Sequence, residues 1–179
     1  MKTNKQVKRP FLLAFAAGMI AAMPLAPSSA QEETAVVTEG INHLGLAVKD
    51  LDRSVAFFTE TLGWRTTGGD PDYPAVFVTD SKVFLTLWQV TDPATAVEFN
   101  RKNNVGLHHL AITVKSLKAL HELHEKFQKV EGVRIEFAPE FMGQGPTTHM
   151  MIREPSGNRL EFVVPGGRVR AEMNAQEQD

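Results

Sequence analysis

Hydrophobic and polar residues alternate along two short segments of the chain, and the two segments resemble each other. Residues 41–49 read Ile-Asn-His-Leu-Gly-Leu-Ala-Val-Lys, and residues 107–115 read Leu-His-His-Leu-Ala-Ile-Thr-Val-Lys. Alternation with a period of two predicts a β-strand, and a repeated segment indicates two units of the same design. Each segment is therefore expected to begin one module.

A helical pattern follows each of these strands, and three further strand candidates follow each helix. Segments rich in glycine, proline and aspartate separate the strands and are typical of turns. In the first module we expect a helix at residues 51–62 and strands at 64–67, 75–79 and 83–90. In the second module we expect a helix that begins near Ser116 and strands at 133–137, 148–153 and 159–164. The pattern predicts an α+β fold with two βαβββ modules, residues 41–90 and 107–165, joined by a linker at residues 91–106.

The same alternation places three residues of types that bind metals on one face of the predicted sheets. His43 and its repeat His109 lie on the face opposite the helix in their strands. In the last strand Glu161 stands between Leu160 and Phe162 and points to that face as well. A buried carboxylate needs a partner, and a cation held together with two imidazoles would supply it. His43, His109 and Glu161 are therefore the candidate ligands of one divalent metal.

A substrate pocket is expected around these ligands. Its predicted side chains are Phe77, Phe84, Thr86 and Trp88 from the first module, and His149, Met151 and Arg153 from the second. Such a lining suits an aromatic or otherwise apolar substrate that carries an anionic group. For His149, a role as an acid or base beside the metal and a role as an ordinary strand-end residue both remain open. Arg153 either binds substrate or pairs with a neighbouring carboxylate.

With these motifs in register, the chain resembles the vicinal oxygen chelate superfamily, which includes glyoxalase I, extradiol dioxygenases and fosfomycin-resistance transferases. The resemblance spans about residues 40–165 and depends on the segments around His43, His109 and Glu161. It implies that the modules form a cupped mixed sheet around a divalent metal that chelates adjacent oxygens of a substrate. It also implies a catalytic role for Glu161, with His149 nearby.

Two departures from that superfamily leave several functions open. Thr86 occupies the position that repeats Glu161, where glyoxalase I usually has a carboxylate, and Met151 stands where extradiol dioxygenases carry a tyrosine. The first hypothesis is a glyoxalase-like metal enzyme with lyase or isomerase chemistry. The alternatives are an iron(II) extradiol-type dioxygenase and a non-catalytic protein that binds a drug or metabolite, as bleomycin-resistance relatives do. Iron, zinc, manganese and nickel are all compatible with the nitrogen and oxygen ligands.

The start of the chain predicts export. Four basic residues (Lys2, Lys5, Lys8 and Arg9) precede an apolar run at residues 11–25, and small residues follow at 28–30. This is the pattern of a cleavable signal peptide over residues 1–30, followed by a short linker at 31–40, so we expect a periplasmic or secreted protein without stable membrane insertion. The tail, residues 166–179, is polar and expected to be mobile.

Charge narrows the partners that we expect for the mature chain. Of the 179 residues, 19 are lysine or arginine and 21 are aspartate or glutamate, so losing the four basic residues would leave a net charge of −6. A negatively charged surface does not favour the binding of nucleic acid. The chain has no cysteine, so any metal must be held by nitrogen and oxygen. We expect a small-molecule substrate and, as a further possibility, a homodimer.

Overall fold

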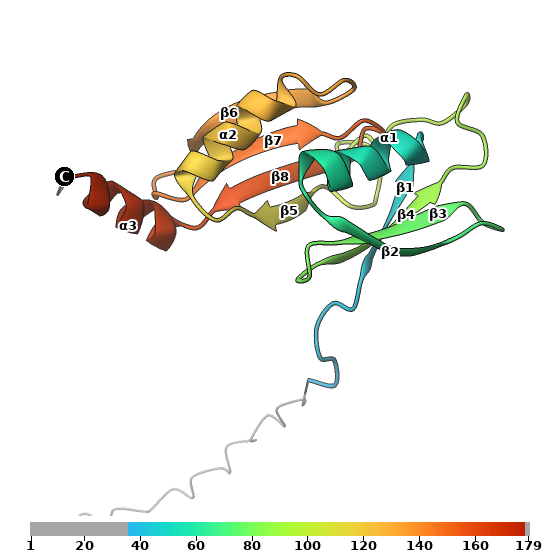
Figure 1. Ribbon diagram of the computed structural model, residues 1–179, viewed down its shortest axis with the longest axis horizontal. Helices are drawn as coiled ribbons and strands as arrows, with labels where there is room; N and C mark the ends of the chain where they lie inside the picture. The colour runs from blue at the N-terminus through green and yellow to red at the C-terminus, as the bar shows by residue number, and fades with distance from the viewer. Residues whose placement is uncertain (1–35, 178–179) are drawn as a thin grey trace, which may run out of the picture. The chain divides into compact units, whose positions relative to one another are not determined.

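The computed structural model describes residues 36–177, so the expected signal peptide lies outside the described residues. Each module has a four-stranded mixed sheet with one helix on one of its faces (Figure 1). The first module consists of β1 (Leu44–Val48), α1 (Leu51–Ala56), a π-helical turn (Phe57–Thr61), β2 (Arg65–Asp70), β3 (Ala75–Thr79) and β4 (Phe84–Gln89). The second consists of β5 (Leu110–Thr113), α2 (Leu117–Phe127), β6 (Arg134–Phe141), β7 (Thr148–Arg153) and β8 (Arg159–Val164), and α3 (Gly166–Gln176) follows it.

The two modules share one strand topology. The strand orders are β1-β4-β3-β2 and β5-β8-β7-β6, with the first strand parallel to the last and the other pairs antiparallel. This confirms the predicted α+β fold of two βαβββ modules. The sheets remain two separate four-stranded units, because no strand of one pairs with a strand of the other among the described residues. Within residues 36–177, no helix is long and apolar enough to span a membrane.

A single hydrophobic core joins the helix-covered faces of both sheets. The ring of Phe57 stacks on Phe127 of α2 with centroids 5.7 Å apart, and Phe127 in turn contacts Phe162 of β8 at 5.1 Å. These side chains are almost completely buried. As expected from alternation, the intervening residues Gly45, Ala47, Ala111 and Thr113 are exposed. The faces that carry the candidate ligands therefore point away from the shared core.

The first helix begins at Leu51, as expected for the helix over 51–62, but only its first half is α-helical. Asp50 caps its N-terminus, because the carboxylate accepts a hydrogen bond from the Arg53 amide, as is typical of this residue type. From Phe57 onward the helix widens into a π-helical turn. Phe57 and Phe58 are adjacent in sequence and both buried, and this turn is the segment that brings both rings into the core.

Three predicted segments differ from the structure, and the first is the strand expected at 133–137, which extends to Phe141 as β6. The strand expected at residues 64–67 ends later, because Gly68, Gly69 and Asp70 continue β2 past an irregularity in its pairing with β3. The tail expected to be mobile forms α3 over Gly166–Gln176. Its Val169 is fully buried, and Arg168 donates to the carbonyl of Val114. One buried apolar side chain and these polar contacts hold the helix against the second module.

Glu172 of α3 caps the start of α2, which gives a test of this docking. Its carboxylate accepts from the amides of Leu117 at 2.7 Å and Lys118 at 3.2 Å. Replacing a capping acceptor by alanine typically costs about 1 kcal/mol, so Glu172→Ala should lower the free energy of unfolding by about that amount in a denaturant titration. The exposed Glu125 of α2 supplies the control, since Glu125→Ala should change stability little. Equal effects of both substitutions would contradict the capping role.

Candidate functional site

The centre of the candidate site is the carboxylate of Glu161 on β8. Its side chain is only 8% exposed and lies between two imidazoles. One carboxylate oxygen is 3.1 Å from Nε2 of His109, and the other is 2.5 Å from Nδ1 of His149. A carboxylate with so little contact with water is costly unless charge or hydrogen bonds compensate it, and these two rings are its partners.

Strand register explains why these three side chains meet. β5 runs parallel to β8 with Ala111 opposite Glu161, so His109, two residues earlier, reaches the carboxylate diagonally. β7 runs antiparallel to β8 with Met151 opposite Glu161, and His149 approaches from the other diagonal. The ring of Phe137 on β6 packs against His149 with centroids 4.9 Å apart and restricts its orientation.

His43 lies apart from this cluster within one chain. It forms a hydrogen bond of 2.8 Å with Asn42 and an edge contact with the ring of Phe84. The far end of β1 contacts the turn before β8, where the Asn158 amide donates to the Ala47 carbonyl at 2.9 Å. The chain of β1 runs toward this turn, and His43 precedes β1. The chain of β8 runs away from the turn, so His43 and Glu161 lie on opposite sides of it. Among residues 36–177, no three side chains of suitable type are grouped to hold a metal ion.

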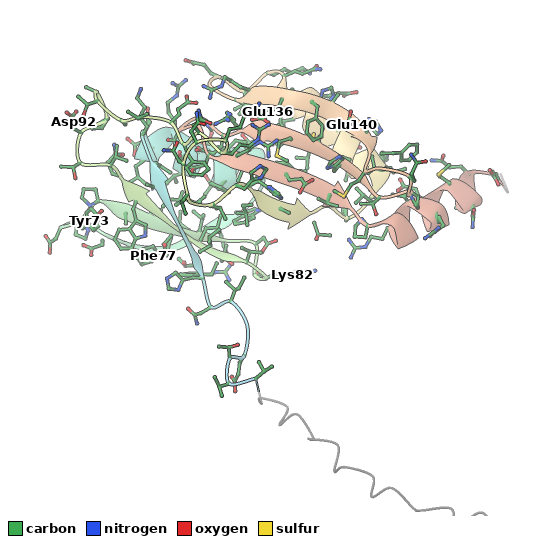
Figure 2. The ribbon with its side chains drawn as sticks, turned by 180° about the vertical axis from the view of Figure 1, so that it is seen from behind. Tyr73, Phe77, Lys82, Asp92, Glu136 and Glu140 are labelled. Atoms are coloured by element: carbon green, nitrogen blue, oxygen red, sulfur yellow. The ribbon has the colours of Figure 1, made fainter. Side chains whose placement is uncertain are left out.

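The corresponding face of the first module carries a row of aromatic rings. Trp88 contacts Tyr73 and Phe77, with ring centroids 5.1 and 6.0 Å away, and Phe77 continues the row to Phe84 at 6.0 Å. Figure 2 labels Tyr73 and Phe77 in this module. Trp88 also donates a hydrogen bond of 2.8 Å to the hydroxyl of the buried Thr86. The predicted pocket residues of this module thus lie on one face, with Tyr73 as an aromatic neighbour that the sequence did not single out.

Arg153 and a second arginine, Arg159, share one carboxylate beside the Glu161 cluster. Glu136 of β6 accepts from Nε of Arg153 at 3.0 Å and from Nε of Arg159 at 2.7 Å. Burial acts to raise the pKa of Glu136, but the hydrogen bonds and charges of Arg159 and Arg153 outweigh it and lower the pKa below its usual value. Arg159 was missed, although it precedes Glu161 by two residues and alternation places it on the same face.

A second buried carboxylate, Glu154, was also missed and lies between the modules. Its side chain is fully buried and accepts hydrogen bonds from the Ser54 hydroxyl, the Ser156 amide, and both the backbone and side-chain amides of Asn158. The only signal was the Glu-Pro-Ser-Gly-Asn segment, which reads as a turn. Ser54 belongs to α1, so this network connects the first helix to the β7–β8 turn.

Comparisons with known proteins agree with this architecture. A model of the Glyoxalase/Bleomycin resistance protein/Dioxygenase superfamily matches residues 40–162. A 2-epi-5-epi-valiolone epimerase from an Actinomyces species is 28% identical over 150 residues, which cover 71% of this chain and 80% of that protein.

Solved structures of related fold extend over the same part of the chain. A glyoxylase/bleomycin resistance protein/dioxygenase domain from Frankia sp. EAN1pec is 25% identical to this chain, with a TM-score of 0.61. The match covers 71% of this chain and 98% of the Frankia domain. A lactoylglutathione lyase from Agrobacterium tumefaciens has a TM-score of 0.52 at 20% identity, covering 76% and 97%. The fosfomycin resistance protein FosX from Listeria monocytogenes has a TM-score of 0.57 at 17% identity, covering 74% and 98%. At these identities the last two similarities establish the fold alone.

Proposed function

Because the chain belongs to the Glyoxalase/Bleomycin resistance protein/Dioxygenase superfamily, we propose that it is a metal-dependent enzyme that moves a proton on a small oxygenated substrate. The reaction is of the lyase or isomerase type. The observation that carries this proposal is Glu161, held between His109 and His149 on a face that points away from the core. The epimerase named above supports the reaction class, since its name describes an enzyme of the isomerase type.

The ligand set that we propose contains His109 and Glu161 from one chain and His43 from a second copy. The first two side chains already meet, and they fit a divalent ion that takes nitrogen and oxygen ligands. His43 stands on the equivalent face of the other module, which is left open in the single chain. A homodimer that brings two such faces together would complete two identical sites. A metal bound there would polarise a carbonyl or diol oxygen of the substrate.

The side chains around the ligands have separate roles in this proposal. His149 uses Nδ1 to contact Glu161, which leaves Nε2 to accept a proton from the substrate and return it. Thr86 has no ionisable carboxyl group, so it cannot act as the second carboxylate base found in glyoxalase I. The aromatic row with Trp88 and Phe77 would cover the substrate and exclude water from it.

The alternatives find less support in the geometry. Met151 lies opposite Glu161 and is 3% exposed, and its thioether has no proton to give, which argues against the acid-base step of an extradiol-type dioxygenase. A non-catalytic binding protein needs no imidazoles around a buried carboxylate. Export to the periplasm or medium is also a proposal, which rests on the basic and apolar pattern of residues 1–30.

Metal analysis of the purified mature protein tests the proposal. The unsubstituted protein should contain about one divalent metal per chain, and both His43→Ala and Glu161→Ala should lose it, because three protein ligands are the usual minimum for a catalytic site. His121→Ala on the exposed face of α2 is the matched control and should retain the metal. Metal contents unchanged by the first two substitutions would overturn the ligand assignment. If the unsubstituted protein binds no metal, the proposed metal enzyme is wrong, and the non-catalytic binding of a small molecule becomes the favoured function.

A further inference from the structure

A cavity of about 270 Å³ lies where β1 meets the β7–β8 turn and the linker. Gly45 and Ala47 of β1 contribute little side-chain volume to its wall, whereas Val97 and Leu107 give it apolar surface. The size suits a small organic molecule. None of the proposed metal ligands lines this cavity, although Arg153 of the predicted substrate pocket does.

The charged residues that line the cavity are mainly cationic. They are Lys49, Arg101, Arg153 and Arg159, with Glu98 as the only carboxylate among them. Glu98 is already paired with Arg134, whose guanidinium is 2.5 Å away. Arg134, Glu136 and the buried Glu154 lie next to these lining residues. With them included, five cationic side chains stand against three carboxylates. The surroundings of the cavity therefore carry a net charge of about +2, on a mature chain that is acidic overall.

Two of these arginines are rigidly placed and retain donors. The side chains of Arg153 and Arg159 are only 18% and 9% exposed, and Glu136 fixes both through Nε (Figure 2 labels Glu136). Nη1 of Arg153 donates to the Gly157 carbonyl at 3.1 Å, and Nη1 of Arg159 is 3.5 Å from His108. Among the described residues, neither Nη2 group hydrogen-bonds to protein, and no buried polar side-chain atom lacks a partner. Both Nη2 groups are thus accessible donors.

We propose that this cavity binds a small organic anion through Arg153, Arg159 and Arg101. Guanidinium groups held in fixed orientations match the geometry of carboxylate and phosphate oxygens. The apolar part of the wall suits a short hydrocarbon or ring attached to the anionic group. A molecule with a carboxylate or a phosphate monoester is accordingly the ligand class.

Calorimetric titration with benzoate and with phenyl phosphate tests this inference directly. The mature chain should bind at least one of them saturably with one site per chain, in the presence of a chelator, and Arg159→Gln should weaken binding about tenfold or more. Arg101→Gln is the second variant, since Arg101 lies in the linker and takes no part in the Glu136 pairs. It should weaken binding as well, and it decides the result if Arg159→Gln does not fold. Arg65→Gln on the exposed part of β2 is the control and should bind as the unsubstituted chain does.

One further variant separates this inference from the proposed function. His109→Ala removes a proposed metal ligand and should leave anion binding unchanged. If neither probe binds, or if the arginine variants that fold bind like the control, the cavity is not an anion site. Binding that His109→Ala abolishes while Arg159→Gln and Arg101→Gln retain it would place the anion beside His109 rather than in the cavity and overturn the inference, without contradicting the metal enzyme.

Discussion

Refolding an equal mixture of His43→Ala and His109→Ala chains should restore about a quarter of the metal bound by the unsubstituted protein, although neither variant should bind metal alone. Half of the dimers formed from such a mixture are hybrids. In each hybrid, the chain with an intact His109 also has Glu161, and the other chain supplies an intact His43. That gives one complete site out of two, because the second site carries both substitutions.

The measurement is metal content per chain after gel filtration of the refolded dimer. Each variant refolded alone serves as the control for residual binding, and an unsubstituted sample refolded in the same way gives the full value. A mixture that binds no more metal than its components would mean that all ligands come from one chain. Since His43 is remote from Glu161 in the single chain, such a result would require the two modules to rearrange.

Glu154→Ala should lower the free energy of unfolding by about 3 kcal/mol or more. The carboxylate is fully buried, and its removal would leave the backbone amides of Ser156 and Asn158 without their acceptor, while the Ser54 hydroxyl would keep only its contact with the Ser156 hydroxyl. Each buried donor that loses its partner costs about 1–3 kcal/mol. A denaturant titration at constant pH measures the change, and the midpoint should move with little change of slope.

Glu131→Ala is the matched control for this substitution. Glu131 is also an acidic residue that contacts the first helix, through an ion pair of 2.6 Å with Arg53, but its side chain is 90% exposed. Exposed pairs of this kind contribute about 0–1 kcal/mol. If the two substitutions had similar effects, the hydrogen bonds of Glu154 would not be what stabilises the contact between α1 and the turn.

The fold was largely accessible from sequence because the core faces follow strict alternation. Leu46 and Val48 in β1, and Leu160 and Phe162 in β8, are buried as their spacing predicts. What escaped prediction depends on contacts distant in sequence. α3 is stabilised by Val169 packing against the second module and by Glu172 meeting the amides of α2, and nothing in the polar tail itself indicates those partners.

The sequence predicted which residues form the site and on which face of its own sheet each one lies. It did not predict whether the face that carries His43 meets the face that carries Glu161. Alternation correctly put Glu161 and His149 on one face, and register then brought them together. The same reasoning treats His43 as equivalent to His109, because a repeat carries no information on whether its two copies face each other. Arg159 and Glu136 illustrate the other limit, since their pairing joins β8 to β6 across the intervening strand β7.

The aromatic stack that runs from Phe57 through Phe127 to Phe162 has a consequence for cooperativity. Neither module can close its apolar face without the other, because each contributes rings to the same cluster. The chain is therefore expected to unfold as one thermodynamic unit, with a single heat-absorption peak whose van't Hoff and calorimetric enthalpies coincide. A fragment that ends within the linker would lose Phe127 and would expose to water the ring of Phe57 that packs against it. We therefore expect the two halves of the internal repeat to fold only together.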